Sequence, residues 1–197
     1  MVDANAAPHG PELKRELRAG IRAARAALGD EALLAAREGL AERLAELAAA
    51  RGARSLSCFL PIRSEPDTRG FLERAATLGI EVLLPSVRED GRLDWIVGGG
   101  GATRRGAFGI DEPLGEVRDP LAVAEVDLML VPAAAVDLVG TRLGWGRGFF
   151  DRALSALPHR PPVYAVVHDH EVVDRLPREP HDVPVDGVVT PLRVLAF

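Results

Sequence analysis

The sequence is organised around a glycine-rich segment that reads Thr141-Arg142-Leu143-Gly144-Trp145-Gly146-Arg147-Gly148-Phe149-Phe150-Asp151-Arg152. An apolar run from Val126 to Pro132 precedes it and predicts a buried strand that ends at the proline. Residues Phe149 to Leu157 follow and predict a short helix. The local order is therefore strand, loop, glycine-rich turn and helix.

The alternating glycines of this segment, Gly144, Gly146 and Gly148, favour a site for an anion. Without a Cβ atom, glycine adopts positive φ and lets the backbone come close to a ligand. The backbone N–H groups and the N-terminus of the following helix then form a pocket for phosphate. Arg142 and Arg147 add positive charge, and arginine matches phosphate oxygens with two hydrogen bonds. The alternative is a purely structural turn, because glycine-rich turns between strand and helix are common.

Asp151 falls in the first turn of the expected helix. A carboxylate at that position either caps the helix or holds a divalent cation over the phosphates. The segment is not a Walker loop, because no Gly-Lys-Ser/Thr follows, and its glycine spacing differs from the dinucleotide-binding fingerprint. The residues alone leave both roles of Asp151 open.

Composition limits the class of protein. A chain of 197 residues with 47% hydrophobic content can bury one good core. A net charge of −5 argues against general binding to nucleic acid or membrane, so an anionic ligand requires a local basic cluster. No apolar stretch approaches the roughly 18 residues of a membrane-spanning helix, and Met1 to Pro11 lacks the apolar region of a signal peptide. We therefore expect a cytoplasmic monomer whose single Cys58 lies in the core.

Helical and extended patterns alternate along the chain. Helices are expected over residues 11–28, 30–50, 69–78 and 149–157, and strands over 55–60, 81–84, 93–97, 126–132, 162–167 and 188–190. Asp30 is the expected N-cap of the second helix, Gly52 and Gly79 are expected helix stops, and Pro61 and Pro85 are expected strand ends. The pattern predicts an α/β fold, a three-layer sandwich with a largely parallel central sheet flanked by helices. Residues 1–197 are expected to form a single domain, with residues 1–10 as a disordered tail.

The first expected helix carries a basic row beside its apolar face. Lys14, Arg18, Arg22 and Arg25 fall within about a quarter of the helical wheel, at the edge of that face. One interpretation is a solvated basic face, which the residues alone favour. The other is that these side chains point across the domain toward a ligand.

Glu65 follows the expected strand 55–60 and precedes Pro66. Loops that leave the carboxyl ends of strands are where open α/β sheets place their binding sites. The alternative is that Glu65 is only a favourable charge near the N-terminus of the next helix.

Further candidates have weaker support. Trp95 is either a core residue or a wall for a flat ligand, Phe108 is expected in the core, and Arg105 is expected to be an ordinary surface arginine. His168-Asp169-His170 places three titratable groups in a row. Adjacent residues of a strand or loop point to alternate sides, so we do not expect these groups to converge on one metal ion.

Val131-Pro132, Asp137, Gly140 and the segment from Arg142 to Arg152 resemble the signature of the 5-formyltetrahydrofolate cyclo-ligase family, also called 5,10-methenyltetrahydrofolate synthetases. The resemblance covers nearly the whole chain, including residues 108–113 and a closing pattern over residues 176–190. It implies a magnesium- and ATP-dependent enzyme of one-carbon metabolism. Its reaction is the cyclisation of 5-formyltetrahydrofolate to 5,10-methenyltetrahydrofolate through a phosphorylated formyl intermediate, with release of ADP and phosphate.

The resemblance also implies roles for particular residues. Lys14 and Arg18 match a Lys-x-x-x-Arg pair that binds ATP phosphates, whereas Arg22 and Arg25 have no match and remain a predicted solvated face. The other implied ATP-binding residues are Arg142, Leu143, Gly144, Trp145, Gly146, Arg147, Gly148, Phe149 and Phe150. The implied folate-binding residues are Leu60, Glu65, Trp145, Gly146, Arg147, Gly148 and Phe149. Asp151 and Asp182 are the implied Mg²⁺ ligands, and His181 is a candidate to orient Asp182.

Two departures from the family pattern bear on the substrate. Phe149-Phe150 replaces a usual Tyr-Tyr pair, which keeps the aromatic faces but removes the phenolic hydroxyls. Arg147 stands between Gly146 and Gly148, where the family often has the middle glycine of a Gly-Gly-Gly run. Two alternatives therefore stand beside the cyclo-ligase hypothesis: an enzyme that uses ATP to activate another formylated heterocycle, and a nucleotide- or folate-binding protein without turnover.

Overall fold

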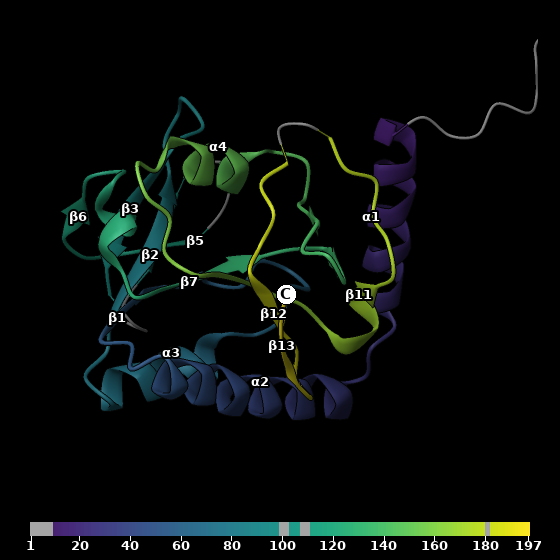
Figure 1. Ribbon diagram of the computed structural model, residues 1–197. Coiled ribbons are helices and arrows are strands. Elements are labelled where there is room, and N and C mark those ends of the chain that lie inside the picture. Colours follow the sequence, from purple (N-terminus) through teal and green to yellow (C-terminus); the bar gives the residue numbers. More distant parts are fainter. Residues whose placement is uncertain (1–9, 99–102, 107–110, 180–181) are drawn as a thin grey trace, which may run out of the picture.

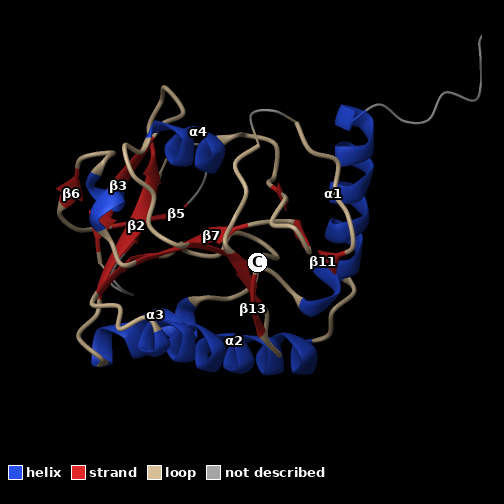
Figure 2. Cartoon of the chain, in the orientation of Figure 1, coloured by secondary structure: helices blue, strands red, loops and turns tan. Residues whose placement is uncertain are grey.

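The computed structural model of the protein describes residues 10–98, 103–106, 111–179 and 182–197. One large sheet forms the middle layer, and helices cover it (Figures 1 and 2). The helices are α1 (Gly10–Ala26), α2 (Asp30–Ala50), α3 (Arg69–Thr77) and α4 (Phe149–Ala156). Helices α2 and α3 lie side by side along one face, while α4 covers the opposite face. The predicted α/β sandwich with a largely parallel central sheet is confirmed.

The large sheet has eight strands in the order β13-β12-β10-β7-β1-β2-β3-β6. Its strands are β1 (Ser55–Ser57), β2 (Glu81–Val87), β3 (Leu93–Val97), β6 (Val117–Arg118), β7 (Leu128–Pro132), β10 (Val163–Val166), β12 (Gly187–Val189) and β13 (Val194–Ala196). The central pairs, from β12 through β10, β7 and β1 to β2, are parallel, and the outer pairs are antiparallel. Small sheets are formed by β4 (Thr103–Arg105) with β5 (Asp111–Pro113), and by β11 (Val172–Val173), β8 (Ala135–Asp137) and β9 (Arg142–Leu143).

The connections of the sheet reverse direction between β1 and β7. From β1 the chain continues outward through α3 to β2 and then β3, whereas from β7 it proceeds to β10 and β12 on the other side. Ligands of open α/β sheets bind outside the carboxyl ends of the strands at such a switch point. The loops that leave β1 and β7 are therefore where a site is expected.

The core lies on both faces of the sheet. Along β7, Leu128 and Leu130 pack toward the cluster beneath α2 and α3, while Met129 and Val131 pack toward the cluster beneath α4. This alternation follows from the two-residue period of a strand, and burial on both faces explains why β7 is apolar throughout. Each fully buried side chain of this size stabilises the fold by about 1.5–3 kcal/mol relative to exposure.

Trp95 and Cys58 both belong to the core. Trp95 is fully buried, and its indole nitrogen donates to Pro120 O at 3.1 Å. This decides between its two interpretations in favour of a core residue. Cys58 is also fully buried, as predicted.

The structure corrects some predicted boundaries. Pro85 does not end its strand, because β2 continues to Val87; only residues 81–83 of β2 pair with β1, so one edge of the strand is unpaired beyond them, where proline is tolerated. Asp30 is not an N-cap but the first residue of α2, and Gly29 precedes it as the cap. Gly52 and Gly79 follow α2 and α3 with positive φ, as helix stops do. Phe108, His181 and most of the glycine turn at residues 98–101 lie outside the described residues.

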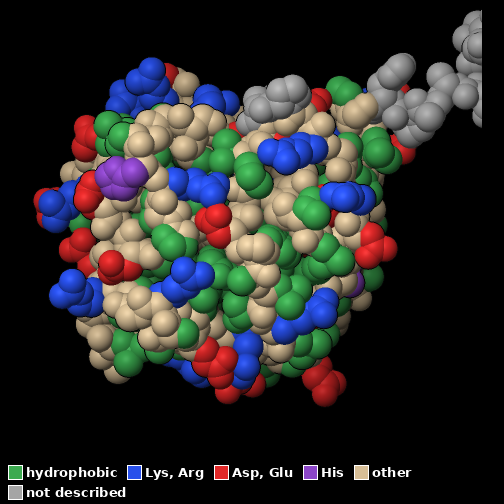
Figure 3. Space-filling model, viewed as in Figure 1, with side chains coloured by type: hydrophobic (Ala, Val, Ile, Leu, Met, Phe, Trp, Pro, Cys, Tyr) green, Lys and Arg blue, Asp and Glu red, His purple; other side chains and the backbone are tan. Residues whose placement is uncertain are grey.

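The surface facing the viewer in Figure 3 carries basic and acidic side chains interspersed, with hydrophobic side chains between them. Arg105 lies on the surface and pairs with Asp111 at 3.2 Å, as expected of an ordinary surface arginine. Among the described residues, no helix has the length and apolar character to cross a membrane.

Candidate active site

A cleft of about 320 Å³ opens where the loops after β1 and β7 meet the glycine-rich segment and α4. Its lining residues are Arg22, Phe59, Leu60, Ile62, Arg63, Ser64, Glu65, Pro85, Val87, Leu93, Asp111, Pro132, Arg142, Gly144, Trp145, Arg147, Gly148, Phe149, Phe150 and Asp151. Apolar and aromatic walls with a few charged groups are typical of sites for small molecules. A larger hollow, about 640 Å³, lies between α2 and α3, but it is far from the strand ends and the glycine-rich segment.

The glycine-rich segment adopts the backbone that its composition predicted. Gly146 has φ +93° and Gly148 has φ +66°, and Gly148 is the residue that leads into α4. Side chains other than glycine rarely adopt these values. Gly144 has no positive φ, but a Cβ atom there would lie 3.1 Å from Arg142 Nη1, so its small size keeps room for the arginine.

Arg142 and Asp151 hold the two ends of this segment together. Arg142 Nη2 donates to Asp151 Oδ1 at 2.5 Å, and Nη1 donates to Pro132 O at 3.3 Å. Arg142 Nε is buried and has no hydrogen-bond partner among the described residues. A buried donor without a partner is costly in a protein, so Arg142 is suited to receive an anionic ligand.

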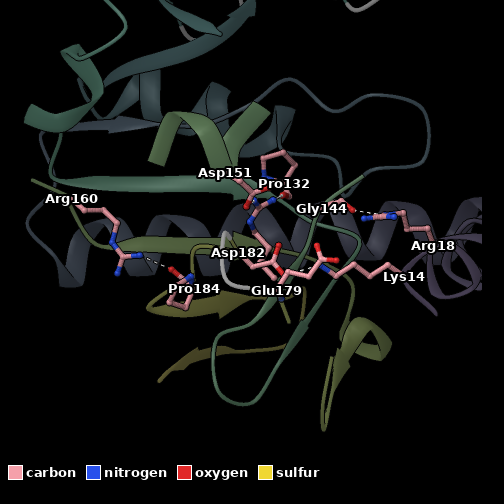
Figure 4. A network of polar contacts seen from close by, with 10 residues as sticks. Lys14, Arg18, Pro132, Gly144, Asp151, Arg160, Glu179, Asp182 and Pro184 are labelled. Atoms are coloured by element: carbon pink, nitrogen blue, oxygen red, sulfur yellow. Dashed lines mark hydrogen bonds and ion pairs between the residues drawn. The ribbon is translucent and has the colours of Figure 1, made fainter. Parts of the chain in front are cut away.

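Lys14 anchors the end of α1 to the loop before β12 (Figure 4). Its Nζ donates to Asp182 Oδ2 at 2.7 Å and to Glu179 Oε2 at 3.1 Å, and the lysine is 7% exposed. Burial lowers the pKa of Lys14, but hydrogen bonds to Asp182 and Glu179 outweigh it, so the pKa is raised overall. Lys14 is thus a fully charged partner of two carboxylates.

Arg18 connects α1 directly to the glycine-rich segment. Its Nε donates to Gly144 O at 2.7 Å (Figure 4). Burial and the neighbouring Arg22 lower its pKa, while Asp182, Glu179 and Asp151 raise it. All three carboxylates are therefore within electrostatic range of one guanidinium, so α1, α4 and the segment before β12 meet at Arg18.

Glu65 lies in the wall of the cleft and is partly buried. The backbone N–H of Ile62 donates to Glu65 Oε2 at 3.0 Å. Burial raises the pKa of Glu65 to about 7, although the Ile62 N–H, Arg25 and Trp145 act against the rise. The Trp145 indole N–H approaches the carboxyl closely enough to lower its pKa but makes no hydrogen bond of normal geometry. Glu65 therefore carries unused acceptor capacity in an apolar setting.

The prediction that Arg25 lies on a solvated face is wrong. Arg25 is 2% exposed and forms two hydrogen bonds with Glu171, from Nε at 2.5 Å and from Nη2 at 2.8 Å. The signal for its burial was present, because Arg25 continues the i, i+4 row of Leu17 and Ile21, which pack inward. Arg22 is exposed but lines the cleft, so it too has more than a solvent-facing position.

The structure brings together most of the predicted site. Leu60, Glu65, Arg142, Gly144, Trp145 and the run from Arg147 to Asp151 line one cleft. Lys14, Arg18, Gly146 and Asp182 do not line it. Arg18 contacts the glycine-rich segment at Gly144 O and lies beside Gly146, while Lys14 and Asp182 pair with each other, and Asp182 is within electrostatic range of Arg18. Leu143 is 2% exposed, so its side chain is a core residue, and its carbonyl oxygen accepts a hydrogen bond from the Ala134 N–H. Sequence reasoning missed Arg63, Glu171 and Glu179.

The predicted Mg²⁺ ligands each contact a cation in this structure. Asp151 pairs with Arg142 and Asp182 pairs with Lys14. Within the described ranges, no group of three or more His, Cys, Asp or Glu side chains converges as a metal site. Mg²⁺ is commonly held by one or two carboxylates together with substrate phosphates, so this donor set fits a Mg²⁺ that arrives with a nucleotide.

His168 and His170 lie at the start of a short helical turn after β10. His168 has extended backbone and caps a short 3-10 helix, Asp169–Glu171, which contains His170, and the two rings stack with centroids 5.9 Å apart. The Nε2 atom of His168 is buried without a partner, and burial lowers its pKa. Both histidines lie outside the lining of the cleft.

Comparison with known proteins yields one consistent match. A model described as the 5-formyltetrahydrofolate cyclo-ligase family matches residues 11–191. The chain is 39% identical over 145 residues to a 5-formyltetrahydrofolate cyclo-ligase of Mycolicibacterium smegmatis, covering 71% of this chain and 75% of that protein. It is 34% identical over 148 residues to the Escherichia coli K12 protein of the same name, covering 72% and 80%. The solution structure of an Aquifex aeolicus 5,10-methenyltetrahydrofolate synthetase superimposes with a TM-score of 0.79 and 32% identity, covering 93% of this chain and 92% of that one.

Proposed function

Because the chain belongs to the 5-formyltetrahydrofolate cyclo-ligase family, we propose that it catalyses the ATP-dependent cyclisation of 5-formyltetrahydrofolate to 5,10-methenyltetrahydrofolate. The observation that carries the proposal is a single cleft with two chemically different parts. Glu65 and aromatic side chains form one part, and Arg142 with the glycine-rich segment forms the other. The first part suits a flat heterocycle with N–H donors, and the second suits a triphosphate.

The reaction needs activation of a formamide. The formyl group on N5 is a weak electrophile, and its oxygen is a poor leaving group. In the proposed sequence the formyl oxygen attacks the γ-phosphorus of ATP, and ADP leaves. The lone pair of N10 then attacks the formyl carbon, N10 loses its proton, and phosphate departs with the former formyl oxygen. The products are 5,10-methenyltetrahydrofolate, ADP and phosphate.

The protein contributes mainly position and charge. Phosphoryl transfer of this kind depends on alignment and on neutralising the charge of the phosphate oxygens. Lys14, Arg18 and Arg142 are the proposed cationic groups, and the backbone N–H groups of Gly144 to Gly148 are the proposed neutral donors. The link between Arg18 and Gly144 O supports this assignment, because it places α1 at the edge of the glycine-rich segment.

Asp151 and Asp182 are the proposed ligands of Mg²⁺. These two carboxylates would hold a Mg²⁺ that arrives with ATP, and the ion would supply positive charge to offset that of the phosphates. In that state Arg142 and Lys14, which now pair with these aspartates, are free to turn toward phosphate. The ion pairs Lys14–Asp182 and Arg142–Asp151 thus neutralise these four charges in the absence of nucleotide. In the proposed complex, phosphate replaces the aspartates as the partner of the two cations.

Glu65 is the proposed recognition group for the folate ring. A carboxylate accepts hydrogen bonds from the N–H groups of a pterin, and the adjacent Leu60 and Trp145 offer apolar surface to its faces. Phe149 and Phe150 keep the aromatic surface of the family's usual tyrosines without a hydroxyl. Ring packing is therefore expected to contribute more here than a phenolic hydrogen bond.

A direct assay tests the proposal. Purified protein is incubated with 5-formyltetrahydrofolate and Mg-ATP, and the absorbance of the methenyl product and the release of ADP are followed together. Equal rates of both, with neither in the absence of ATP, support the proposed reaction. ATP binding without methenyl formation overturns it and favours the alternatives, which are distinguished by whether another formylated heterocycle stimulates ADP release.

A further inference from the structure

The buried pair of Arg25 and Glu171 lies behind the wall of the cleft. Both side chains are 0% exposed, and neither residue lines the cleft itself. Arg25 comes from α1 and Glu171 from the turn after β10, so the pair joins segments that are 146 residues apart. Removing two charges from water costs several kcal/mol per ion, and their attraction only roughly compensates, so stability alone does not explain such a pair.

The contacts of Arg25 indicate what the pair supports. Its Nη2 also donates to Ala133 O at 3.0 Å, just beyond the end of β7. Its Cζ lies 5.0 Å from the centre of the Trp145 ring, within the range of a cation–π contact. Its Nη1 is buried and has no hydrogen-bond partner among the described residues. The aromatic face of Trp145 therefore offsets the missing hydrogen bond on the Nη1 side of the guanidinium.

Trp145 has no hydrogen bond of normal geometry from its indole N–H to fix its orientation. Its neighbours on both sides in sequence are the glycines 144 and 146, which leave the backbone permissive. The indole N–H is buried, and the ring packs against the apolar cluster of Ala134, Ala135, Leu143 and Leu176. Arg22 Cζ also lies 5.9 Å from the ring centre, but Arg22 is exposed, whereas Arg25 is buried and held by Glu171. Apolar packing alone allows a ring to rotate or slide, whereas a fixed cation beneath it favours one placement.

We propose that Arg25, fixed by Glu171, is a positioning residue that holds the Trp145 ring as a wall of the cleft beside Glu65 and so sets the affinity for the flat ring of the substrate. The identity of that substrate rests on the proposed function, but the placement of Trp145 does not. Arg25 is suited to this task where lysine is not, because its planar fork binds the Glu171 carboxylate with two hydrogen bonds while its face lies over the indole. The two hydrogen bonds to Glu171 thus fix the guanidinium of Arg25, and the guanidinium fixes the Trp145 ring.

Tryptophan fluorescence gives a test that does not depend on turnover. The chain has two tryptophans, so Trp95→Phe leaves Trp145 as the single fluorophore. In this background Arg25→Met with Glu171→Gln removes both charges at similar volume and leaves no unpaired buried ion. We expect Trp145 to become about twofold or more sensitive to a soluble quencher in the absence of ligand. In the chain with Trp95 retained, we expect the KM for 5-formyltetrahydrofolate to rise about tenfold with a smaller change in kcat.

The matched control is Arg51→Met. Arg51 also lies over an aromatic ring, 5.3 Å from the centre of Tyr164, and donates to Tyr164 Oη at 2.6 Å, but neither residue lines the cleft. This variant should leave both the Trp145 quenching and the KM unchanged, even where its thermal stability falls. Arg25→Lys keeps a positive charge without the fork and should reproduce most of the rise in KM.

A folded Arg25→Met/Glu171→Gln variant with wild-type quenching and wild-type KM overturns the proposal. If that variant does not fold, Trp145→Leu tests the same wall with the ion pair intact, and an unchanged KM overturns the proposal. If the wild-type protein does not convert 5-formyltetrahydrofolate, the proposed function fails, while the ligand-free quenching still decides whether Arg25 positions Trp145.

Discussion

Arg142 and Asp151 close the glycine-rich segment on itself, with Arg142 Nη2 2.5 Å from Asp151 Oδ1. The arginine belongs to β9 and the aspartate to the first turn of α4, so the glycines lie between the two partners. The side chain of Arg142 is 3% exposed and that of Asp151 is 23% exposed. Asp151 is thus the accessible member of the pair, and it faces the cleft as one of its lining residues.

The first prediction concerns the metal. Asp151→Asn and Asp182→Asn remove one negative charge each and weaken the hard oxygen donors that Mg²⁺ prefers. We expect each variant to lower kcat/KM for ATP about tenfold to a hundredfold and to require more Mg²⁺ for half-maximal rate. The measurement is a Mg²⁺ titration of turnover at fixed ATP.

Folate binding in metal-free buffer is the control for this prediction. Calorimetric affinity for 5-formyltetrahydrofolate without ATP or metal should change little in either variant, because the carboxylates are assigned to Mg²⁺ and not to the folate. An equal loss of folate binding in metal-free buffer would mean that Asp151 only closes the segment through Arg142.

The second prediction concerns Glu65 and pH. Burial raises the pKa of Glu65 to about 7, so the carboxyl is half protonated near neutrality. Only the ionised form offers both oxygens purely as acceptors, because protonation makes one of them a donor, so folate affinity should increase as the pH is raised from about 6 to about 8. Glu65→Gln replaces an acceptor oxygen by an N–H donor, and we expect a weaker affinity, by about fivefold to a hundredfold, without this pH dependence. Calorimetry across the pH range measures both effects, and an unchanged affinity refutes the assignment.

The same group has a stability effect with a defined sign. The pKa of Glu65 in the folded protein lies above the value of 4.5 for an unperturbed glutamate, so the folded state binds more protons between these values. The contribution of Glu65 to stability is therefore most favourable below about pH 4.5 and is lost as the pH rises toward 7. The Tm of Glu65→Gln relative to wild type should accordingly increase over this range.

Most of the fold was predictable because local patterns and tertiary structure agree. The apolar run of β7 is buried on both faces, and glycines 52 and 79 end their helices with positive φ. Pro85 was wrongly taken as a strand end, because a sequence does not reveal which edge of a strand is unpaired. The assignment of the whole chain to one domain stays a prediction.

The site was predictable where the signal was local. The glycine-rich segment, Arg142 and Asp151 lie close in sequence, and their pattern indicates an anion site directly. Arg25 and Glu171 were not predicted as a pair, because their contact depends on a separation of 146 residues that no local pattern records. Lys14 was predicted to face phosphate, but its pairing with Glu179 and Asp182 is equally long-range.

The third prediction concerns α1. Arg18→Ala removes a cation from the edge of the glycine-rich segment and its bond to Gly144 O, and we expect the KM for ATP to rise about tenfold. Lys14→Ala should have a similar effect on ATP and also lower the Tm by about 2–6 °C, because it leaves two carboxylates together without their cation. Higher salt should reduce the ATP effect of both variants.

Arg15→Ala is the control on the same helix, because Arg15 is exposed and lies outside the cleft lining. It should leave the KM for ATP and the Tm close to wild type. If Arg15, Arg18 and Lys14 variants all behaved alike toward ATP, α1 would act only through its general positive charge.

The last prediction distinguishes two reasons for a glycine at position 146: the fold requires it, or phosphate binding requires it. Gly146 has φ +93°, and a Cβ atom there would lie 3.5 Å from Arg18 Cζ, so Gly146→Ala strains the backbone without a severe clash. Gly52 has φ +61° with nothing within 4 Å of a Cβ atom, so Gly52→Ala imposes a similar strain far from the cleft. Both variants should lose about 2–6 °C in Tm, because a residue other than glycine in this region costs about 1–2 kcal/mol. Only Gly146→Ala should raise the KM for ATP, by about tenfold, because only Gly146 belongs to the segment whose backbone N–H groups are proposed to bind phosphate. Equal KM values for the two variants would limit Gly146 to a role in the turn and remove the glycine-rich segment from the phosphate site.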